Sequence, residues 1–300
     1  MAEEAIRFLR LRPGGFYVDG TLGDGGHSQH MLEADASITV LGIDRDELSL
    51  QLTARRLADF GSRFQTYHGN FSELGAALTA VTRTGADGIL LDLGLSSRQL
   101  DDPARGFSFR AGGPLDMRMH AGVGPSAADL VATLGERELA DIFWRYGEES
   151  ASRRIARAIV NDRETSPFTT TTELADLVER IVHRRGRTHP ATRVFQALRI
   201  AVNHELEHLE YFLAHVLEWL LPAGRLVVIA YHSLEDRMVK QAMRSWLERC
   251  TCPPALPRCA CDARARVKIL TGKVVTPTRD EVDENRRARS ARLRAVEVLA

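Results

Sequence analysis

The sequence predicts an α/β fold in which an all-helical domain is inserted into the segments that form the sheet. Short apolar runs alternate with helical patterns over the first hundred residues or so, and this alternation is typical of α/β proteins. After Leu100 about ninety residues of helical or loop character follow, before an apolar run returns at residues 226–230. We therefore expect a discontinuous domain, residues 1–111 and 191–300, and an inserted helical domain at residues 112–190.

The first hundred residues contain four predicted strands. The first ends at Gly20, where a glycine-rich loop begins, and the fourth is apolar at consecutive positions, as expected when helices cover both faces of a parallel sheet. We place the strands at residues 16–19, 38–44, 64–68 and 87–92. Residues 28–34 are predicted to be helical, and Leu48, Leu52 and Leu57 are predicted to lie on the inner side of the next helix.

The inserted segment and the chain after it follow helical spacing until the sheet resumes. Helical patterns cover Asp129 and Leu130 and residues 138–143, 152–160 and 172–175, and threonines that precede the last of these are candidate caps. Apolar residues from Val194 to Leu220 recur at steps of three and four, which predicts one long helix or two joined helices. We expect residues 222–224 to end it, and residues 226–230 and 267–270 to form strands.

Composition and charge exclude several classes of protein. Hydrophobic residues make up 44% and charged residues 27%, which is ordinary for a globular protein. No apolar run approaches the ~20 residues of a membrane span, and the N-terminus lacks the pattern of a signal peptide, so we expect a cytoplasmic protein without a membrane partner. The net charge is zero, so attraction to nucleic acid would depend on local patches.

Two basic segments are candidates for such patches. Arg184, Arg185 and Arg187 form one cluster, and the stretch from Arg258 to Arg294 holds eleven Lys and Arg against five Asp and Glu. Its arginines at 286, 287, 289, 292 and 294 are candidate phosphate contacts. Solvated loops, or ion pairs with the nearby acidic residues, are the alternative interpretation.

The glycine-rich loop at residues 20–27 predicts a cofactor site. Four glycines follow a strand and precede a helix, so backbone can approach a ligand at the helix N-terminus. The spacing is not Gly-x-Gly-x-x-Gly, which favours a cofactor without phosphates, such as S-adenosylmethionine, over a dinucleotide. Asp44 ends the second strand, where a carboxylate can accept hydrogen bonds from both ribose hydroxyls. A tight turn and a helix cap are the structural alternatives.

Several longer motifs stand together in the chain. They are GTLGDGGHS at residues 20–28, LDLGLSS at 91–97, QLDD at 99–102, RGFSF at 105–109, GPLDMRM at 113–119, HPATR at 189–193 and HSLEDR at 232–237. With these motifs the sequence strongly resembles the bacterial family of small-subunit (16S) ribosomal RNA cytosine-N4 methyltransferases, from about Pro13 to Leu293. The resemblance implies a Rossmann-like methyltransferase sheet with an inserted helical domain, acting on a cytidine in the decoding region.

The resemblance also implies particular site residues. The cofactor contacts of the family fall here on Gly25, Gly26, His27, Asp44, Phe71, Asp92 and Gln99, with Asp44 at the ribose and Phe71 beside the adenine. The implied partner is small-subunit ribosomal RNA or the assembled small subunit. The family pattern further leads us to expect a His-x-Pro-Val stretch near the start, where this sequence has residues 1–5 as MAEEA.

The chemistry of amine methylation suggests further candidates. Asp92 ends the fourth strand and His232 follows the fifth, so either is a candidate for accepting a proton from the amine. Both have alternatives, since Asp92 can serve the cofactor alone and His232 can be structural. The substrate-binding candidates are the possible stacking rings of Phe107 and Phe109 and the possible RNA contacts Asp116 and Arg118. Core packing of the rings and an internal ion pair are the alternatives.

All four cysteines lie close together, at Cys250, Cys252, Cys259 and Cys261. Four thiols match the ligand count of a structural zinc site, and free thiols are the alternative in a reducing compartment.

Two other functions use some of the same features. A nicotinamide-dependent oxidoreductase shares the sheet and the ribose carboxylate but requires the missing phosphate loop. A non-catalytic RNA-binding protein of ribosome assembly requires only the basic patches, and the intact glycine loop together with Asp44 argues against it.

Overall fold

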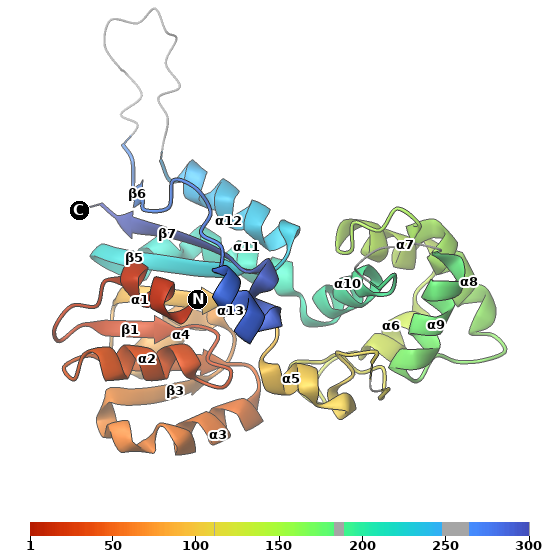
Figure 1. Cartoon of the computed structure of the whole chain (residues 1–300), viewed down its shortest axis with the longest axis horizontal. Coiled ribbons are helices and arrows are strands. Elements are labelled where there is room, and N and C mark those ends of the chain that lie inside the picture. Colours follow the sequence, from red (N-terminus) through yellow and green to blue (C-terminus); the bar gives the residue numbers. More distant parts are fainter. Residues whose placement is uncertain (111, 183–188, 248–263, 300) are drawn as a thin grey trace, which may run out of the picture. The chain divides into compact units, whose positions relative to one another are not determined.

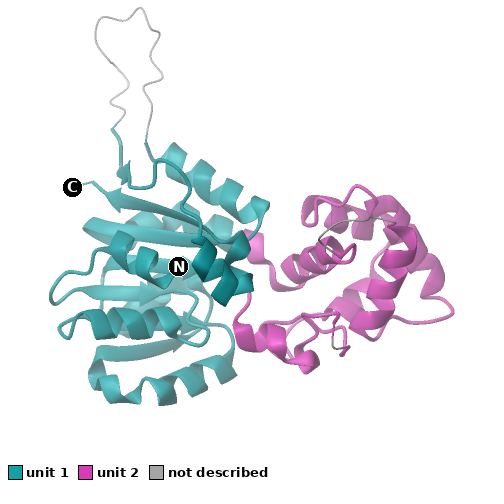
Figure 2. Cartoon of the chain, in the orientation of Figure 1, with its two compact units in different colours: residues 1–94, 207–300 teal, residues 95–206 magenta. Residues whose placement is uncertain are grey.

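The computed structural model describes residues 1–110, 112–182, 189–247 and 264–299. The chain forms two compact units (Figure 2): unit 1 comprises Met1–Gly94 and Glu207–Ala300, and unit 2 comprises Leu95–Leu206. Unit 2 includes more residues at both ends than the insertion predicted at residues 112–190. The reason is packing, because Phe107 on one flank and Val194, Phe195 and Leu198 on the other belong to the core of unit 2.

Unit 1 contains a seven-stranded sheet with the order β3-β2-β1-β4-β5-β7-β6 (Figure 1). Strands β3, β2, β1, β4 and β5 are parallel, and β7 pairs antiparallel with both β5 and β6. The strands are β1 (Phe16–Asp19), β2 (Thr39–Asp44), β3 (Phe64–His68), β4 (Ala86–Asp92), β5 (Leu220–Ala230), β6 (Val267–Ile269) and β7 (Arg292–Val298). The strands predicted at 64–68 and 267–270 are confirmed, whereas β7 was not predicted.

Helices cover both faces of this sheet. Consecutive residues of a strand enter different cores: Leu91 packs with α4, α11 and α12, and Leu90 packs with α1 and α2. The helices are α1 (Ala2–Leu9), α2 (Gly26–Ala34), α3 (Glu47–Arg56), α4 (Leu74–Ala80), α11 (Glu205–His215), α12 (Ser233–Ser245) and α13 (Arg279–Glu284). Short 3-10 turns lie at Ala58–Arg63, Phe71–Glu73, Val216–Glu218 and Arg286–Ser290. The continuous apolar runs of the central strands therefore arise from burial on both sides.

The inner face of α3 differs from the prediction. Leu48 and Leu52 are 53% and 37% exposed, whereas Leu50, Thr53 and Leu57 are buried. The side chain of Asp46 accepts hydrogen bonds from the backbone of Leu48 and Ser49 and so sets where the helix begins. The buried residues Leu50, Thr53 and Leu57 follow i, i+3, i+7 spacing, so the central buried position is a threonine and not the predicted Leu52.

Unit 2 is built from helices. They are α5 (Ser97–Asp101), α6 (Ala127–Thr133), α7 (Glu136–Arg145), α8 (Ser152–Asp162), α9 (Thr171–Ile181) and α10 (Thr192–Asn203), with a 3-10 turn at Pro103–Arg105. The threonine cap before α9 is confirmed, since the Thr170 side chain and Glu173 form a capping box. Asn203 of α10 accepts from the Met119 backbone amide at 2.7 Å and donates to the Met117 carbonyl at 2.8 Å. These bonds hold the loop that carries the GPLDMRM motif.

The long helical pattern from Val194 to Leu220 is two helices, as one of the two alternatives expected. His204 lies between α10 and α11 with φ of 50°, in the left-handed region that ends a helix. Pro222, Ala223 and Gly224 do not end this helix, because they already lie within β5. Within the described residues, no helix combines the length and the apolar character needed to cross a membrane.

The arginines of β7 are part of the fold. Arg294 Nε donates to Asp236 Oδ1 at 2.7 Å, and Arg292 Nη1 lies 3.2 Å from Asp236 Oδ2. Burial acts to raise the pKa of Asp236, but the hydrogen bonds and charges of Arg294 and Arg292 outweigh it and lower this pKa. Arg294, with 14% of its side chain exposed, is thus bound to a carboxylate on α12 and is part of the fold, whereas a phosphate contact of Arg292, which is 49% exposed, stays a prediction.

Arg294→Ala is expected to lower the free energy of unfolding by about 3 kcal/mol, because it leaves the nearly buried Asp236 carboxylate without its main partner. Arg289→Ala, an exposed position before β7, is the matched control and should change stability by less than about 0.5 kcal/mol. Urea unfolding of both variants measures the difference, and equal midpoints would show that the ion pair does not stabilise the sheet.

Candidate cofactor-binding site

The glycine loop connects β1 to α2 and opens at the helix N-terminus. Gly25 has φ of 71°, and a Cβ there would lie 2.4 Å from the Cγ2 atom of Thr53, so only glycine fits. At Gly26, by contrast, a Cβ would meet no atom within 4 Å. The start of α2 is therefore open at Gly26, and the first backbone N–H groups of the helix, which have no partner within the helix, can bind a polar or anionic group there.

The carboxyl ends of three neighbouring strands meet at this loop. Asp19, Asp44 and Asp92 end β1, β2 and β4, and the strand order reverses between β1 and β4. Ligands of open α/β sheets bind at such a reversal, beyond the carboxyl ends of the strands. The loop ties the strand ends together, since Asp92 N donates to Thr21 Oγ1 at 2.6 Å.

Asp44 is held by the backbone and remains half-buried. Its Oδ2 atom accepts from Gly23 N at 2.7 Å, and its Oδ1 atom accepts from Asp46 N at 2.8 Å. Burial raises the pKa of Asp44. Each carboxylate oxygen can accept a second hydrogen bond, so the side chain is oriented by the protein and can still accept from two hydroxyls.

His27 lies between two carboxylates at the start of α2. Its Nε2 atom is 3.2 Å from Asp92 Oδ2, and Asp19 lies fully buried behind it and accepts from Ser28 Oγ at 2.8 Å. Burial acts to lower the pKa of His27, but the hydrogen bond and charge of Asp92, together with the charge of Asp19, raise it overall. Burial raises the pKa of Asp19.

The raised pKa of His27 predicts a pH dependence of stability. A histidine with a raised folded-state pKa stabilises the protein fully below its unfolded pKa, near 6.5, and this contribution is lost as pH rises through the folded value. We expect the free energy of unfolding of the cofactor-free protein to fall across that range. His27→Gln should flatten the fall, and the exposed His30→Gln in the same helix should not. Denaturant unfolding between pH 5.5 and 8.5 tests this, and identical profiles for His27→Gln and the parent protein would contradict it.

Two buried polar atoms beside the glycine loop have no hydrogen-bond partner among the described residues. They are Nδ1 of His27 and Oδ1 of Asp92. Because buried polar atoms of folded proteins are nearly always hydrogen-bonded, both point to a polar ligand at the loop. The His27 Nδ1 atom, the space at Gly26 and the two-acceptor carboxylate of Asp44 fit S-adenosylmethionine, which has an amino acid end and a ribose but no phosphate.

Phe71 and Gln99 differ in how the structure places them. Phe71 follows β3, and its Cβ atom would be 3.2 Å from a Cβ at Gly20, so it lies against the glycine loop. Its ring packs edge-on against Phe212 at 5.6 Å. Gln99 belongs to unit 2, where its side chain accepts from Ser96 N at 3.1 Å in a capping box. Its contact with a cofactor stays a prediction.

His232 is the N-cap of α12. Its Nδ1 atom accepts from Glu235 N at 3.4 Å, and its Nε2 atom lies 3.1 Å from Glu235 Oε1. Glu235 in turn accepts from the Tyr231 backbone at 2.9 Å. The Nδ1 contact fits the structural alternative for His232, whereas its buried Nε2 atom has no hydrogen-bond partner among the described residues, so a catalytic role for His232 stays a prediction.

Sequence analysis missed Thr21, Ser28 and Tyr231 at this site. Burial, followed by the charge of Asp92, raises the pKa of Tyr231, so its hydroxyl stays neutral. Tyr231 directly follows β5, as Asp92 ends β4. Its position at the end of a strand would have predicted Tyr231 as a site residue, because the same position predicted the acidic residues and His232.

The substrate candidates lie in unit 2, and the structure favours structural roles for most of them. Phe107 is only 7% exposed within the core of unit 2, so the stacking role expected for it is wrong. Phe109 packs against His189 and Phe195, with ring centroids 4.6 and 4.9 Å away. Arg118 Nε donates to Asp116 Oδ1 at 2.9 Å. The internal ion pair of Asp116 and Arg118, the alternative expected from the sequence, is therefore present, and their contact with RNA stays a prediction.

Two further expectations fall on residues outside those described. The possible zinc ligands Cys250, Cys252, Cys259 and Cys261, and the basic cluster at Arg184, Arg185 and Arg187, lie there.

The fold and this site together define an S-adenosylmethionine-dependent methyltransferase. The antiparallel β7 between β5 and β6 departs from the parallel 3-2-1-4-5-6 order of the dinucleotide-binding fold, and the loop lacks the pyrophosphate spacing, so the nicotinamide alternative is not favoured. The sequence profile described as the MraW methylase family matches residues 1–299, and the chain belongs to this family.

Its relatives are similar over their whole length. "Ribosomal RNA small subunit methyltransferase H" of Geotalea uraniireducens (strain Rf4) is 52% identical, and the match covers 100% of this chain and 97% of the relative. The protein of that name from Thermomicrobium roseum is also 52% identical, over 99% of this chain and 91% of its own. A solved rRNA methylase from Streptococcus thermophilus is 11% identical, with a TM-score of 0.43 over 100% of this chain and 94% of that one.

Proposed function

We propose that this enzyme transfers the methyl group of S-adenosylmethionine to the exocyclic amino nitrogen of a cytidine in the decoding region of small-subunit ribosomal RNA. The names of relatives about half identical over the full chain support the RNA class. The resemblance of the long motifs supports the cytidine amine. The observation that carries the chemistry is the buried Asp92 Oδ1 atom at the end of β4, which has no partner among the described residues. Such an enzyme acts in the cytoplasm, where ribosomes assemble.

Methylation of the cytosine amine requires the protein to orient the amine and to accept its proton. When bound, S-adenosylmethionine supplies a methyl group on a positively charged sulfur. The cytosine amine is a weak nucleophile because its lone pair is delocalised into the ring, so the protein must orient it and accept the proton that the nitrogen loses. Orientation can supply about 7–11 kcal/mol of the barrier reduction.

We assign the acceptor role to Asp92. His27 Nε2 lies 3.2 Å from its Oδ2 atom and orients the carboxylate, and the backbone N–H of Asp92 donates to Thr21 and holds the main chain at this point. Its Oδ1 atom is left to accept a hydrogen bond from the amine and then the proton. The raised pKa of His27 favours its protonated, positively charged ring beside this carboxylate. Unit 2 is then the substrate domain, presenting a base displaced from its stack.

Methyl transfer from S-adenosylmethionine labelled in its methyl group tests the substrate class. Purified enzyme is incubated with naked small-subunit RNA, with assembled small subunits lacking the modification, and with large-subunit RNA. We expect label in one or both small-subunit acceptors and background label in large-subunit RNA. Equal labelling of large-subunit RNA, or no labelling of any acceptor while the cofactor binds, would overturn the proposed substrate.

A further inference from the structure

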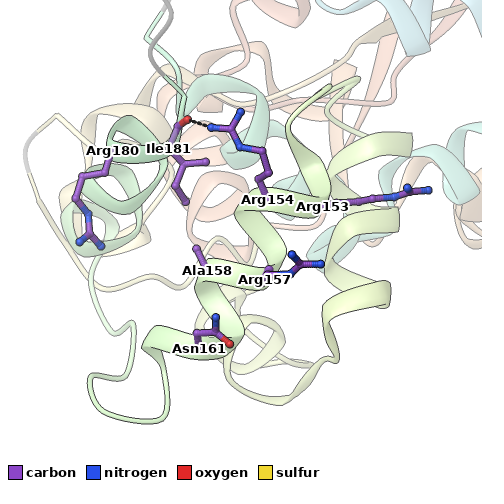
Figure 3. Close-up of a pocket in the computed structure, with 7 residues that line it drawn as sticks. All are labelled: Arg153, Arg154, Arg157, Ala158, Asn161, Arg180 and Ile181. Atoms are coloured by element: carbon purple, nitrogen blue, oxygen red, sulfur yellow. Dashed lines mark hydrogen bonds between the residues drawn. The ribbon is translucent and has the colours of Figure 1, made fainter.

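Four arginines of α8 and α9 line one hollow on the surface of unit 2. Figure 3 shows Arg153, Arg154, Arg157 and Arg180 around this hollow, whose volume is about 500 Å³. Helix α8 buries Ile155, Ala156 and Ile159 and presents its arginines on the other side. We call these four residues the arginine face. It belongs wholly to unit 2 and has no part in the cofactor site.

The partners of these arginines are weak. Arg157 and Arg180 are 71% and 68% exposed, and they lie 3.3 and 3.0 Å from Glu136 and Asp162, which are each 43% exposed. Exposed pairs of this kind contribute little to stability, and a guanidinium with five N–H donors can bind a phosphate as well. The arginine face is therefore poorly explained by folding alone.

The other two arginines differ in their contacts. Arg154 Nη2 donates to the carbonyl of Ile181 at the end of α9, which holds its stem against the hollow. Arg153 has no hydrogen-bond or ion-pair partner among the described residues. Since the whole chain has no net charge, a local cluster of this kind is where a polyanion would be attracted.

An exposed aromatic residue stands beside the arginine face. Trp144 of α7 is 60% exposed, and it lines an adjoining hollow of about 360 Å³ together with Arg153 and Arg154. An indole left in water at this position contributes nothing to the core of unit 2. Its flat face is suited to stacking on an unpaired base, as aromatic residues do in proteins that bind single-stranded RNA.

We propose that the arginine face and Trp144 together bind single-stranded RNA, the guanidinium groups holding phosphates and the indole stacking on a base. The identity of that RNA as a ribosomal segment rests on the proposed function, whereas the binding itself does not. An acidic peptide would use the arginines but not the indole, and a duplex would offer no unpaired base. The combination favours a strand with exposed bases.

Binding of an unstructured RNA oligonucleotide at several salt concentrations tests the proposal. The variant carries Arg153→Ala, Arg157→Ala and Arg180→Ala. A matched control removes three exposed charges from unit 1 with Arg55→Ala, Arg244→Ala and Lys268→Ala. We expect the first variant to bind about tenfold more weakly or worse and its log–log salt slope to be shallower by about 2, at about 0.7 for each lost phosphate contact. The control should keep the parent slope.

Trp144→Ala provides a second readout. It should weaken binding to the single strand by about tenfold, as expected for one lost stacking contact, with the salt slope unchanged. Binding to a duplex of equal length should not change. If the arginine variant keeps the parent slope, or if Trp144→Ala binds the single strand as tightly as the parent, the assignment of this surface is wrong.

The same samples separate this proposal from the proposed function. Calorimetry with S-adenosylmethionine should give the parent affinity for all variants, which shows that unit 1 is intact. Normal RNA binding by the parent protein without methylation of small-subunit RNA would contradict the proposed function. It would not contradict RNA binding by the arginine face and Trp144. Normal methylation and an unchanged salt slope in the arginine variant would contradict the RNA surface alone.

Discussion

Asp92→Asn is expected to lower the rate of methyl transfer by about 10²–10⁴-fold, the usual contribution of a positioned proton acceptor. The amide is nearly the same size. Its oxygen can face His27, and its NH₂ group then replaces the Oδ1 acceptor, so the cytosine amine would meet a donor. Single-turnover methylation measures the loss, and calorimetry should give an affinity for S-adenosylmethionine within about tenfold of the parent value, as expected for one changed hydrogen bond.

His232→Asn is the matched control for this prediction. Asparagine is a good N-cap, so α12 should keep its start and the methylation rate should change little. A large loss in His232→Asn together with a nearly normal rate in Asp92→Asn would reverse the roles assigned to the two residues.

Asp44→Ala is expected to weaken binding of S-adenosylmethionine by about 1.5–3 kcal/mol, or about 10- to 150-fold, because hydrogen bonds from the ribose to a charged acceptor are lost. The variant also frees Gly23 N and Asp46 N from their acceptor, so a melting curve must accompany the titration. Asp44→Asn keeps one acceptor and should lose less. Parent-like affinity in Asp44→Ala, or tight binding of NAD by the parent protein, would contradict the site.

Much of unit 1 could be predicted because its information is local. The strand at 64–68, the glycine loop and the acid at the end of β2 are each specified by a few adjacent residues, and parallel strands buried on both faces give continuous apolar runs. The order of strand, glycine loop, helix, strand and acid was sufficient to predict that Asp44 lies at the glycine loop, where its Oδ2 atom accepts from Gly23 N.

What could not be predicted depends on contacts between distant residues. Arg294 and Asp236 are 58 positions apart, and the charged residues that alternate along β7 resemble a basic tail until that strand pairs with β5. Phe107 looks like a loop aromatic and is buried only because helices far along the chain complete its core. The phase of α3 was misjudged for a local reason, because the Asp46 cap placed Thr53 rather than a leucine inward.

Nucleoside analysis of small-subunit ribosomal RNA by mass spectrometry, in cells with and without this gene, tests the central claim most directly. We predict that one cytidine of the decoding region carries a methyl group on its exocyclic nitrogen only when the gene is present, and that a gene encoding Asp92→Asn fails to restore it. An unchanged set of methylated nucleosides, or the loss of a methyl group from a ring carbon or from another base, would contradict this assignment.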